Sequence, residues 1–275
     1  MKATLTDLAL PLFVPADRPE RFGKADAARP DALIIDLEDA VAPQAKERAR
    51  EALKDKLLAA QVQAPIILRV NAAGTDWHAA DLALARTLPL SAVMVPKAQS
   101  QDEMEQIAEA TSHPVVALIE TAQGLAAVNS IATRAARLAF GSFDFAADMG
   151  MEHTRQSLLT ARFHIALASR AAGLLAPLDG VTTAINDNAV LEDDCRHARE
   201  LGFGGKMLIH PAQLEPARQA FAPSRSQVEW ADRVLSASAA QGVVQIDGMM
   251  IDAPVLARAR QIKTQVQIYS PKENQ

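Results

Sequence analysis

The chain contains 275 residues, and its 28 lysines and arginines against 33 aspartates and glutamates give a formal net charge of −5. This acidic balance argues against nucleic-acid binding, which depends on a basic face. The single cysteine, Cys195, excludes an intrachain disulfide and a zinc site made of thiolates. We find no signal peptide and no apolar run near the ~18 residues of a membrane span, so a soluble cytoplasmic protein is expected.

Short aliphatic runs alternate with longer amphipathic stretches along the chain. The runs cover residues 10–14, 32–37, 66–70, 92–95, 115–119, 137–140, 178–182 and 206–209. Each is almost wholly apolar, as expected for parallel strands that are covered on both faces. Eight strand–helix repeats in about 250 residues predict a (β/α)₈ barrel.

The stretches between the runs have helical periodicity. Helices are predicted at residues 46–59, 81–87, 102–110, 124–136, 154–172 and 191–201. An open doubly wound sheet is the alternative, but the GFGG segment at residues 202–205 precedes a strand instead of opening a helix. We predict a barrel over residues 1–225, and a C-terminal helix with a lid or oligomerisation arm over residues 226–275.

Polar residues follow several of the predicted strands, at the ends that meet at one mouth of a barrel. They are Asp36, Glu38 and Asp39 after the second strand, Arg69 within the third, Lys97 after the fourth, Glu120 after the fifth and Asp144 after the sixth. Strands also end in polar residues simply because they reach the surface. Taken together, however, the pattern favours an active site.

Glu120 and Asp144 follow adjacent strands, so their carboxylates can approach one point. Two oxygen ligands supplemented by water suit Mg²⁺ or Mn²⁺. Arg69, which has apolar neighbours, needs an anion, either a carboxylate such as Glu38 or a substrate oxygen. A metal and an arginine in one cavity suit a small oxyacid whose carbon–carbon bond is made or broken beside a carbonyl.

The motifs at these strand ends resemble those of the citrate lyase β-subunit-like proteins, in the wider superfamily of Mg²⁺-dependent acyl-CoA lyases and aldolases. They are LFVPADRPERFGKA, ALIIDLEDAV, ILRVNAAG, VMVPKA, ALIETAQG, AFGSFDFAADMG, GKMLIHPAQ and MIDAPVLARA, in order from Leu12 to Ala259. The resemblance implies a (β/α)₈ barrel that forms homotrimers or hexamers. It also implies Claisen-type cleavage or formation of a 3-hydroxyacyl-CoA such as citryl-, malyl- or citramalyl-CoA, with acetyl-CoA and a 2-oxo acid as products.

The resemblance also assigns roles to particular residues. Glu120 and Asp144 match the family's Mg²⁺ ligands, with Asp148 as a competitor for the second position. Arg69 matches the arginine that contacts the keto acid and stabilises the enolate. Asp252 matches an acidic residue that reaches a neighbouring subunit's site in related lyases, where an acid/base role is expected.

Further contacts are expected from the second strand and the first loop. Asp36 and Glu38 either hold metal-bound waters or orient Arg69. Arg18, Arg21 and Lys24 are expected to contact the nucleotide end of coenzyme A, the alternative being a solvated basic turn.

Two other functions remain open on the sequence. The first is a CoA-independent aldolase acting on 4-hydroxy-2-oxo acids, although the chain has no histidine between Met1 and Asn71 to serve as its base. The second is a non-catalytic oligomer subunit that binds a 2-oxo acid.

Overall fold

The computed structural model describes residues 8–238, 245–246 and 249–269. The chain divides into two compact units, one ending at Ala217 and the other beginning at Arg218. No helix within these residues is long and apolar enough to cross a membrane.

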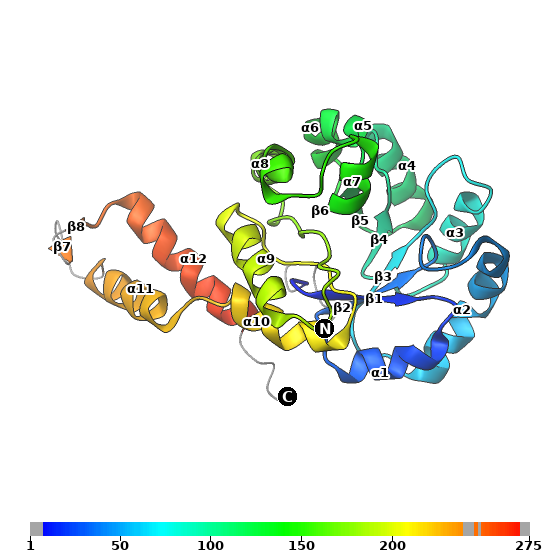
Figure 1. The fold of residues 1–275 in the computed structure, drawn as a ribbon, viewed down its shortest axis with the longest axis horizontal. Helices are drawn as coiled ribbons and strands as arrows, with labels where there is room; N and C mark the ends of the chain where they lie inside the picture. Colours follow the sequence, from blue (N-terminus) through cyan, green and yellow to red (C-terminus); the bar gives the residue numbers. More distant parts are fainter. Residues whose placement is uncertain (1–7, 239–244, 247–248, 270–275) are drawn as a thin grey trace. The chain divides into compact units, whose positions relative to one another are not determined.

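The first unit is built on a parallel sheet of six strands, arranged in chain order. The strands are β1 (Pro11–Pro15), β2 (Ala32–Asp36), β3 (Ile66–Arg69), β4 (Ala92–Val95), β5 (Val115–Ile119) and β6 (Arg137–Phe140). Figure 1 shows these strands curving inside an arc of helices. Residues of β2 to β6 are buried throughout, which explains their continuous apolar sequence. The α/β fold with a curled parallel sheet is therefore confirmed.

The register of the sheet brings the carboxyl ends of neighbouring strands level. Asp36, the last residue of β2, pairs with Arg69, the last residue of β3. In the same way Ile119 at the end of β5 pairs with Phe140 at the end of β6. Residues that follow these strands therefore gather at one edge.

The last two predicted strands are not regular strands, and they join the sheet through isolated parallel bridges. The bridges join Ala139 to Leu178, Asp179 to Lys206, and Leu208 to Leu12. Backbone hydrogen bonds accompany them, such as Phe140 N to Leu178 O at 2.9 Å and Phe13 N to Leu208 O at 2.8 Å. A hydrogen-bonded path thus leads from β6 through both segments back to β1.

Helices follow most strands of this unit, close to the predicted positions. They are α1 (Phe22–Ala27), α2 (Lys46–Ala60), α3 (His78–Ala85), α4 (Gln101–Thr111), α5 (Ala122–Ala126), α6 (Val128–Ala132), α7 (Ser142–Asp148), α8 (Arg155–Ala171), α9 (Asn188–Glu200) and α10 (Leu214–Phe221). Side-chain caps set several of the starts: Ser100 accepts the N–H of Glu103, and Thr154 accepts that of Ser157. The predicted helix at 124–136 is instead two short helices that meet at Ala127.

Alternate residues of the strands form a buried core inside the curled sheet. This core contains Ile34, Ile67, Met94 and Leu118, and Phe13 packs against it. Because side chains alternate across a strand, the residues between them face the helices. Apolar packing therefore closes the interior below the carboxyl ends of the strands.

The second unit is a helical hairpin. Helices α11 (Arg225–Ser238) and α12 (Ala253–Tyr269) pack through Ala231, Val234, Ala259 and Ile262. Two short strands, β7 (Gln245–Ile246) and β8 (Met249–Met250), pair in antiparallel fashion.

A buried ion network joins the two bridging segments to α8. Asp179 accepts from Lys206 Nζ at 3.1 Å and from Arg162 Nε at 3.0 Å, and Lys206 also donates to the carbonyl of Gly180. The charge of Lys206 and that of Arg162 outweigh the effect of burial, so the pKa of Asp179 lies below its ordinary value. The network stabilises the part of the sheet that lacks a regular ladder.

Replacing Asp179 with alanine is expected to lower the free energy of unfolding by about 3–5 kcal/mol, because Lys206 and Arg162 would keep buried charges without a partner. Urea denaturation measures this loss. Glu105→Ala is the matched control, because its pair with Arg134 is exposed and is expected to contribute under about 1 kcal/mol. Equal effects of the two substitutions would show that the buried network has no special role.

Candidate functional site

A cavity of about 200 Å³ lies at the carboxyl ends of the strands. Its wall includes Arg69, Glu120 and Asp144, three residues singled out in the sequence, together with Asp39 and Ser142. Since these residues follow different strands, the level register of the sheet brings them together.

The guanidinium of Arg69 is held by two carboxylates. Its Nε and Nη2 donate to the two oxygens of Asp36 at 2.8 and 2.7 Å, and its Nη1 lies 3.0 Å from Glu38 Oε2. Burial disfavours the charge, but the charge of Asp36 outweighs it, so the pKa of Arg69 lies above its ordinary value. Arg69 also lies over the ring of Phe13, 4.9 Å from its centroid. The side chain is thus fully charged and fixed in place.

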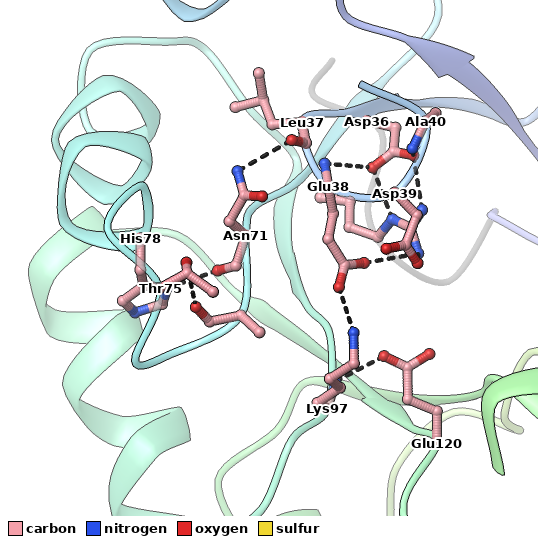
Figure 2. Close-up of polar contacts among 12 residues, drawn as sticks. Asp36, Leu37, Glu38, Asp39, Ala40, Asn71, Thr75, His78, Lys97 and Glu120 are labelled. Carbon is pink, nitrogen blue, oxygen red and sulfur yellow. Dashed lines mark hydrogen bonds and ion pairs between the residues drawn. The ribbon is translucent and has the colours of Figure 1, made fainter. Parts of the chain in front are cut away.

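Lys97 completes this charge cluster (Figure 2). Its Nζ lies 2.7 Å from Glu38 Oε1, whereas Arg69 pairs with the other oxygen of that carboxylate, Oε2. Burial raises the pKa of Glu38, and the charge of Arg69 opposes this rise. The two cations and the carboxylates of Asp36 and Glu38 balance in charge.

Glu120 follows β5 and is only 2% exposed. Its Oε1 accepts the backbone N–H of Lys97 at 2.8 Å, as Figure 2 shows. Lys97 has a positive φ of 49°, a conformation that costs a non-glycine residue energy and points its N–H at the carboxylate. On the other side Gly141 packs against Glu120 Oε2 so closely that a Cβ there would overlap it.

Burial raises the pKa of Glu120 to about 8, and the charges of Glu38 and Asp144 add to this rise. Within the described part of the chain, no lysine or arginine side chain forms an ion pair with Glu120. The charge of Arg69 opposes the rise only in part, so the ionised form of Glu120 stays disfavoured, which is the condition that a bound cation relieves.

Asp144 lies in the first turn of α7, on the same cavity wall. Asp148, the competing candidate, instead accepts the N–H of Ala122 at 2.7 Å. The described residues contain no group of three or more histidine, cysteine, aspartate or glutamate side chains that could hold a metal. The pair Glu120 and Asp144 leaves most positions to water or substrate, which fits Mg²⁺ better than a metal enclosed by protein ligands.

Asp36, at the end of β2, and Asp39, just after it, have different surroundings. Besides holding Arg69, Asp36 accepts the N–H groups of Glu38 and Ala40 at 2.9 and 3.1 Å. Asp36 thus holds both the guanidinium of Arg69 and the turn after β2. Asp39, by contrast, faces the cavity and was not assigned a role from the sequence.

A larger cavity of about 630 Å³ adjoins this one. Arg21 and Lys24 of the first loop line it, whereas the exposed Arg18 does not. Phe13 and Ile209 belong to the walls of both cavities. Basic residues thus line the larger cavity, which adjoins the smaller cavity and its acidic wall.

Asp252 belongs to the second unit, where it starts α12. It is exposed, and its Oδ1 accepts the N–H of Val255 at 3.1 Å. This bond caps the helix, and the acid/base role that the motif implies stays a prediction.

Without metal, the stability of the protein is expected to fall as pH rises from 4.5 to about 8, because Glu120 binds its proton more tightly when folded than when unfolded. Glu120→Gln removes this contribution, so its Tm at pH 9 in chelator is expected to exceed that of the wild type by roughly 5 °C. Thermal melts at pH 5 and pH 9 measure the difference. Glu152→Gln, an exposed change, is the control, and parallel pH curves for all three proteins would contradict the buried charge.

A model of the HpcH/HpaI aldolase/citrate lyase family matches residues 10–211 of the chain. The citrate lyase subunit beta-like protein of Mycobacterium tuberculosis is 39% identical over 258 residues, which cover 90% of this chain and 92% of the relative. The (3S)-malyl-CoA thioesterase of Cereibacter sphaeroides is 35% identical over 261 residues, 91% of each chain.

Among solved structures, the CitE protein of Mycobacterium tuberculosis superposes with a TM-score of 0.84 at 36% identity. The match covers 97% of this chain and 100% of that one, which was crystallised with magnesium, acetoacetate and coenzyme A. The resemblance drawn from the sequence motifs is confirmed. The chain belongs to the HpcH/HpaI aldolase/citrate lyase family.

Proposed function

We propose that this protein is a Mg²⁺-dependent carbon–carbon lyase. It cleaves a 3-hydroxyacyl-CoA such as citryl-, malyl- or citramalyl-CoA to acetyl-CoA and a 2-oxo acid, or forms it in the reverse direction. The observation that carries the proposal is the buried Glu120 carboxylate, without a cation of its own, beside Asp144 and Arg69 in one cavity. The CitE structure with magnesium and coenzyme A supports it.

In this proposal the curled sheet closes as a (β/α)₈ barrel, with the segments at Leu178 and Leu208 as its last two strands. The bridges from β6 back to β1 support that closure. The site then lies at the carboxyl mouth, where barrel enzymes bind their substrates. The second unit is proposed to serve as a lid or contact arm in a homotrimer or hexamer, with Asp252 as the acid or base that it supplies.

Glu120 and Asp144 would hold Mg²⁺ together with water and substrate oxygens. The bound ion would supply Lewis-acid polarisation of the substrate carbonyl and carboxylate. Arg69, already fixed by Asp36, would donate to the oxygen on which negative charge develops. A donor held in place before the reaction needs no reorganisation, and such donors can contribute about 3 kcal/mol to lowering a barrier.

The two adjoining cavities suit the two halves of the substrate. The smaller cavity, with its carboxylates and Arg69, would take the 2-oxo acid part. The larger one, with Arg21 and Lys24, would take the arm of coenzyme A, whose phosphates pair with basic side chains. Phe13 and Ile209, shared by both walls, would lie beside the thioester.

Thioester hydrolysis is a second candidate, because one relative is a (3S)-malyl-CoA thioesterase. The products distinguish the two reactions. Cleavage of malyl-CoA by a lyase gives acetyl-CoA and glyoxylate, whereas hydrolysis gives malate and free coenzyme A.

Incubation with citryl-, malyl- and citramalyl-CoA is expected to release acetyl-CoA from at least one of them with Mg²⁺, and none with chelator. Glu120→Gln is expected to lower kcat by at least about 10²-fold, because the site then loses a metal ligand. Chromatography of the acyl-CoA products measures both effects, with Glu152→Gln as the control. Full activity of Glu120→Gln would refute the metal assignment, and free coenzyme A with malate would favour hydrolysis.

Arg21→Ala and Lys24→Ala are each expected to raise KM for the CoA thioester by about 3–10-fold and to leave kcat nearly unchanged. Each removes roughly 1 kcal/mol of attraction to a phosphate, which is far from the reacting bond. Initial rates over a range of thioester concentrations provide the test. Arg18→Ala is the matched control in the same loop, and equal effects at all three positions would point to nonspecific charge attraction.

A further inference from the structure

A hydrogen bond joins Ser142, on the wall of the smaller cavity, to the exposed residue His153. Ser142, the first residue of α7, is 2% exposed and lines the cavity beside Glu120 and Asp144. The Nε2 atom of His153 lies 3.0 Å from the Ser142 hydroxyl oxygen. The sequence offers no signal for this pair, because the two residues lie eleven positions apart on either side of a turn.

Both partners are held in place by their surroundings. The ring of His153 stacks on that of Phe143, with centroids 3.8 Å apart and an interplanar angle of 7°. A side chain at Gly180 would come within 2.6 Å of the Ser142 hydroxyl oxygen, so glycine there leaves room for the hydroxyl. On its other side His153 lines a separate cavity of about 210 Å³.

The surroundings of His153 favour the neutral form of its ring. Burial and the charge of Arg162 on α8 lower its pKa, against the opposing effects of Asp194 on α9 and of Asp179. A neutral imidazole has one ring nitrogen free to accept a proton. It therefore meets the requirement for a base at neutral pH.

Other residues on the cavity wall meet this requirement less well. Arg69 is a charged donor, and Glu120 and Asp144 face the proposed metal position. Asp39 is the remaining acidic residue on the wall, and its side chain is 60% exposed and 4.0 Å from Arg69. Asp39 is thus the competing base, and it is exposed, as His153 is.

We propose that Ser142 and His153 form a relay that removes the proton of the substrate's 3-hydroxyl group. The proposal rests on the proposed lyase function and names the path of its first proton. Ser142 would contact the substrate, and His153 would accept the proton that Ser142 passes on.

The hydroxyl O–H bond breaks, its proton binds the Ser142 oxygen, and the proton of Ser142 moves to His153 Nε2. The O–H electron pair becomes the second bond of the new carbonyl. The electrons of the broken carbon–carbon bond pass to the thioester α-carbon, giving an enolate that takes a proton from an acid or water. His153 then returns its proton to solvent.

The test compares Ser142→Ala and His153→Phe, the second of which keeps an aromatic ring against Phe143 but removes the nitrogen. With saturating Mg²⁺, both are expected to lower kcat for thioester cleavage by about 10²–10⁴-fold, with KM little changed. The fall of the wild-type kcat at acidic pH, where His153 becomes protonated, is expected to vanish in His153→Phe. His164→Phe on α8 makes the same chemical change at an exposed position and is expected to behave as wild type.

Wild-type rates in both variants would overturn the relay while leaving the lyase function intact. A loss in Asp39→Asn alone would overturn it in favour of Asp39. If the wild type cleaves no thioester, the lyase function itself fails, and imidazole ¹⁵N NMR decides on the pair. A shift of the His153 signals on adding Mg²⁺ and oxaloacetate, absent in Ser142→Ala, would support the connection, and no shift would refute it.

Discussion

The placement of charged side chains out of water, at the carboxyl edge of a buried sheet, is the constraint on which the site depends. Arg69 ends a strand that is buried along its whole length, so its guanidinium needs anions within reach. Asp36 and Glu38 supply them, and Lys97 balances the second carboxylate. The four charges of this cluster balance, which leaves the adjacent Glu120 carboxyl without an ion-pair partner among the described residues.

Much of this arrangement can be predicted from the sequence because its cause is local. Continuous apolar runs identify buried parallel strands, and the first charged residue after each run marks the strand end. That reasoning finds Arg69, Glu120 and Asp144, three residues on one cavity wall. The β2 to β6 runs are recognisable because both of their faces are covered.

The parts that sequence reasoning misses depend on contacts between distant segments. Whether Arg69 pairs with Asp36 or with a ligand depends on strand register, which is set by the packing of β2 against β3. The left-handed backbone of Lys97 has no sequence signal, since it is not a glycine. The last two strands were expected to be regular, but their hydrogen bonds occur as single bridges, and the ion network of Asp179 holds them instead.

Phe13 and Ile209 form a wall that the two cavities share. The ring of Phe13 lies against the guanidinium of Arg69, packs on the core of the sheet and lines both cavities. A smaller residue at this position would enlarge both cavities together and loosen the arginine. The two cavities therefore cannot be reshaped independently at this position, and Ile209 is a second residue whose replacement would alter both.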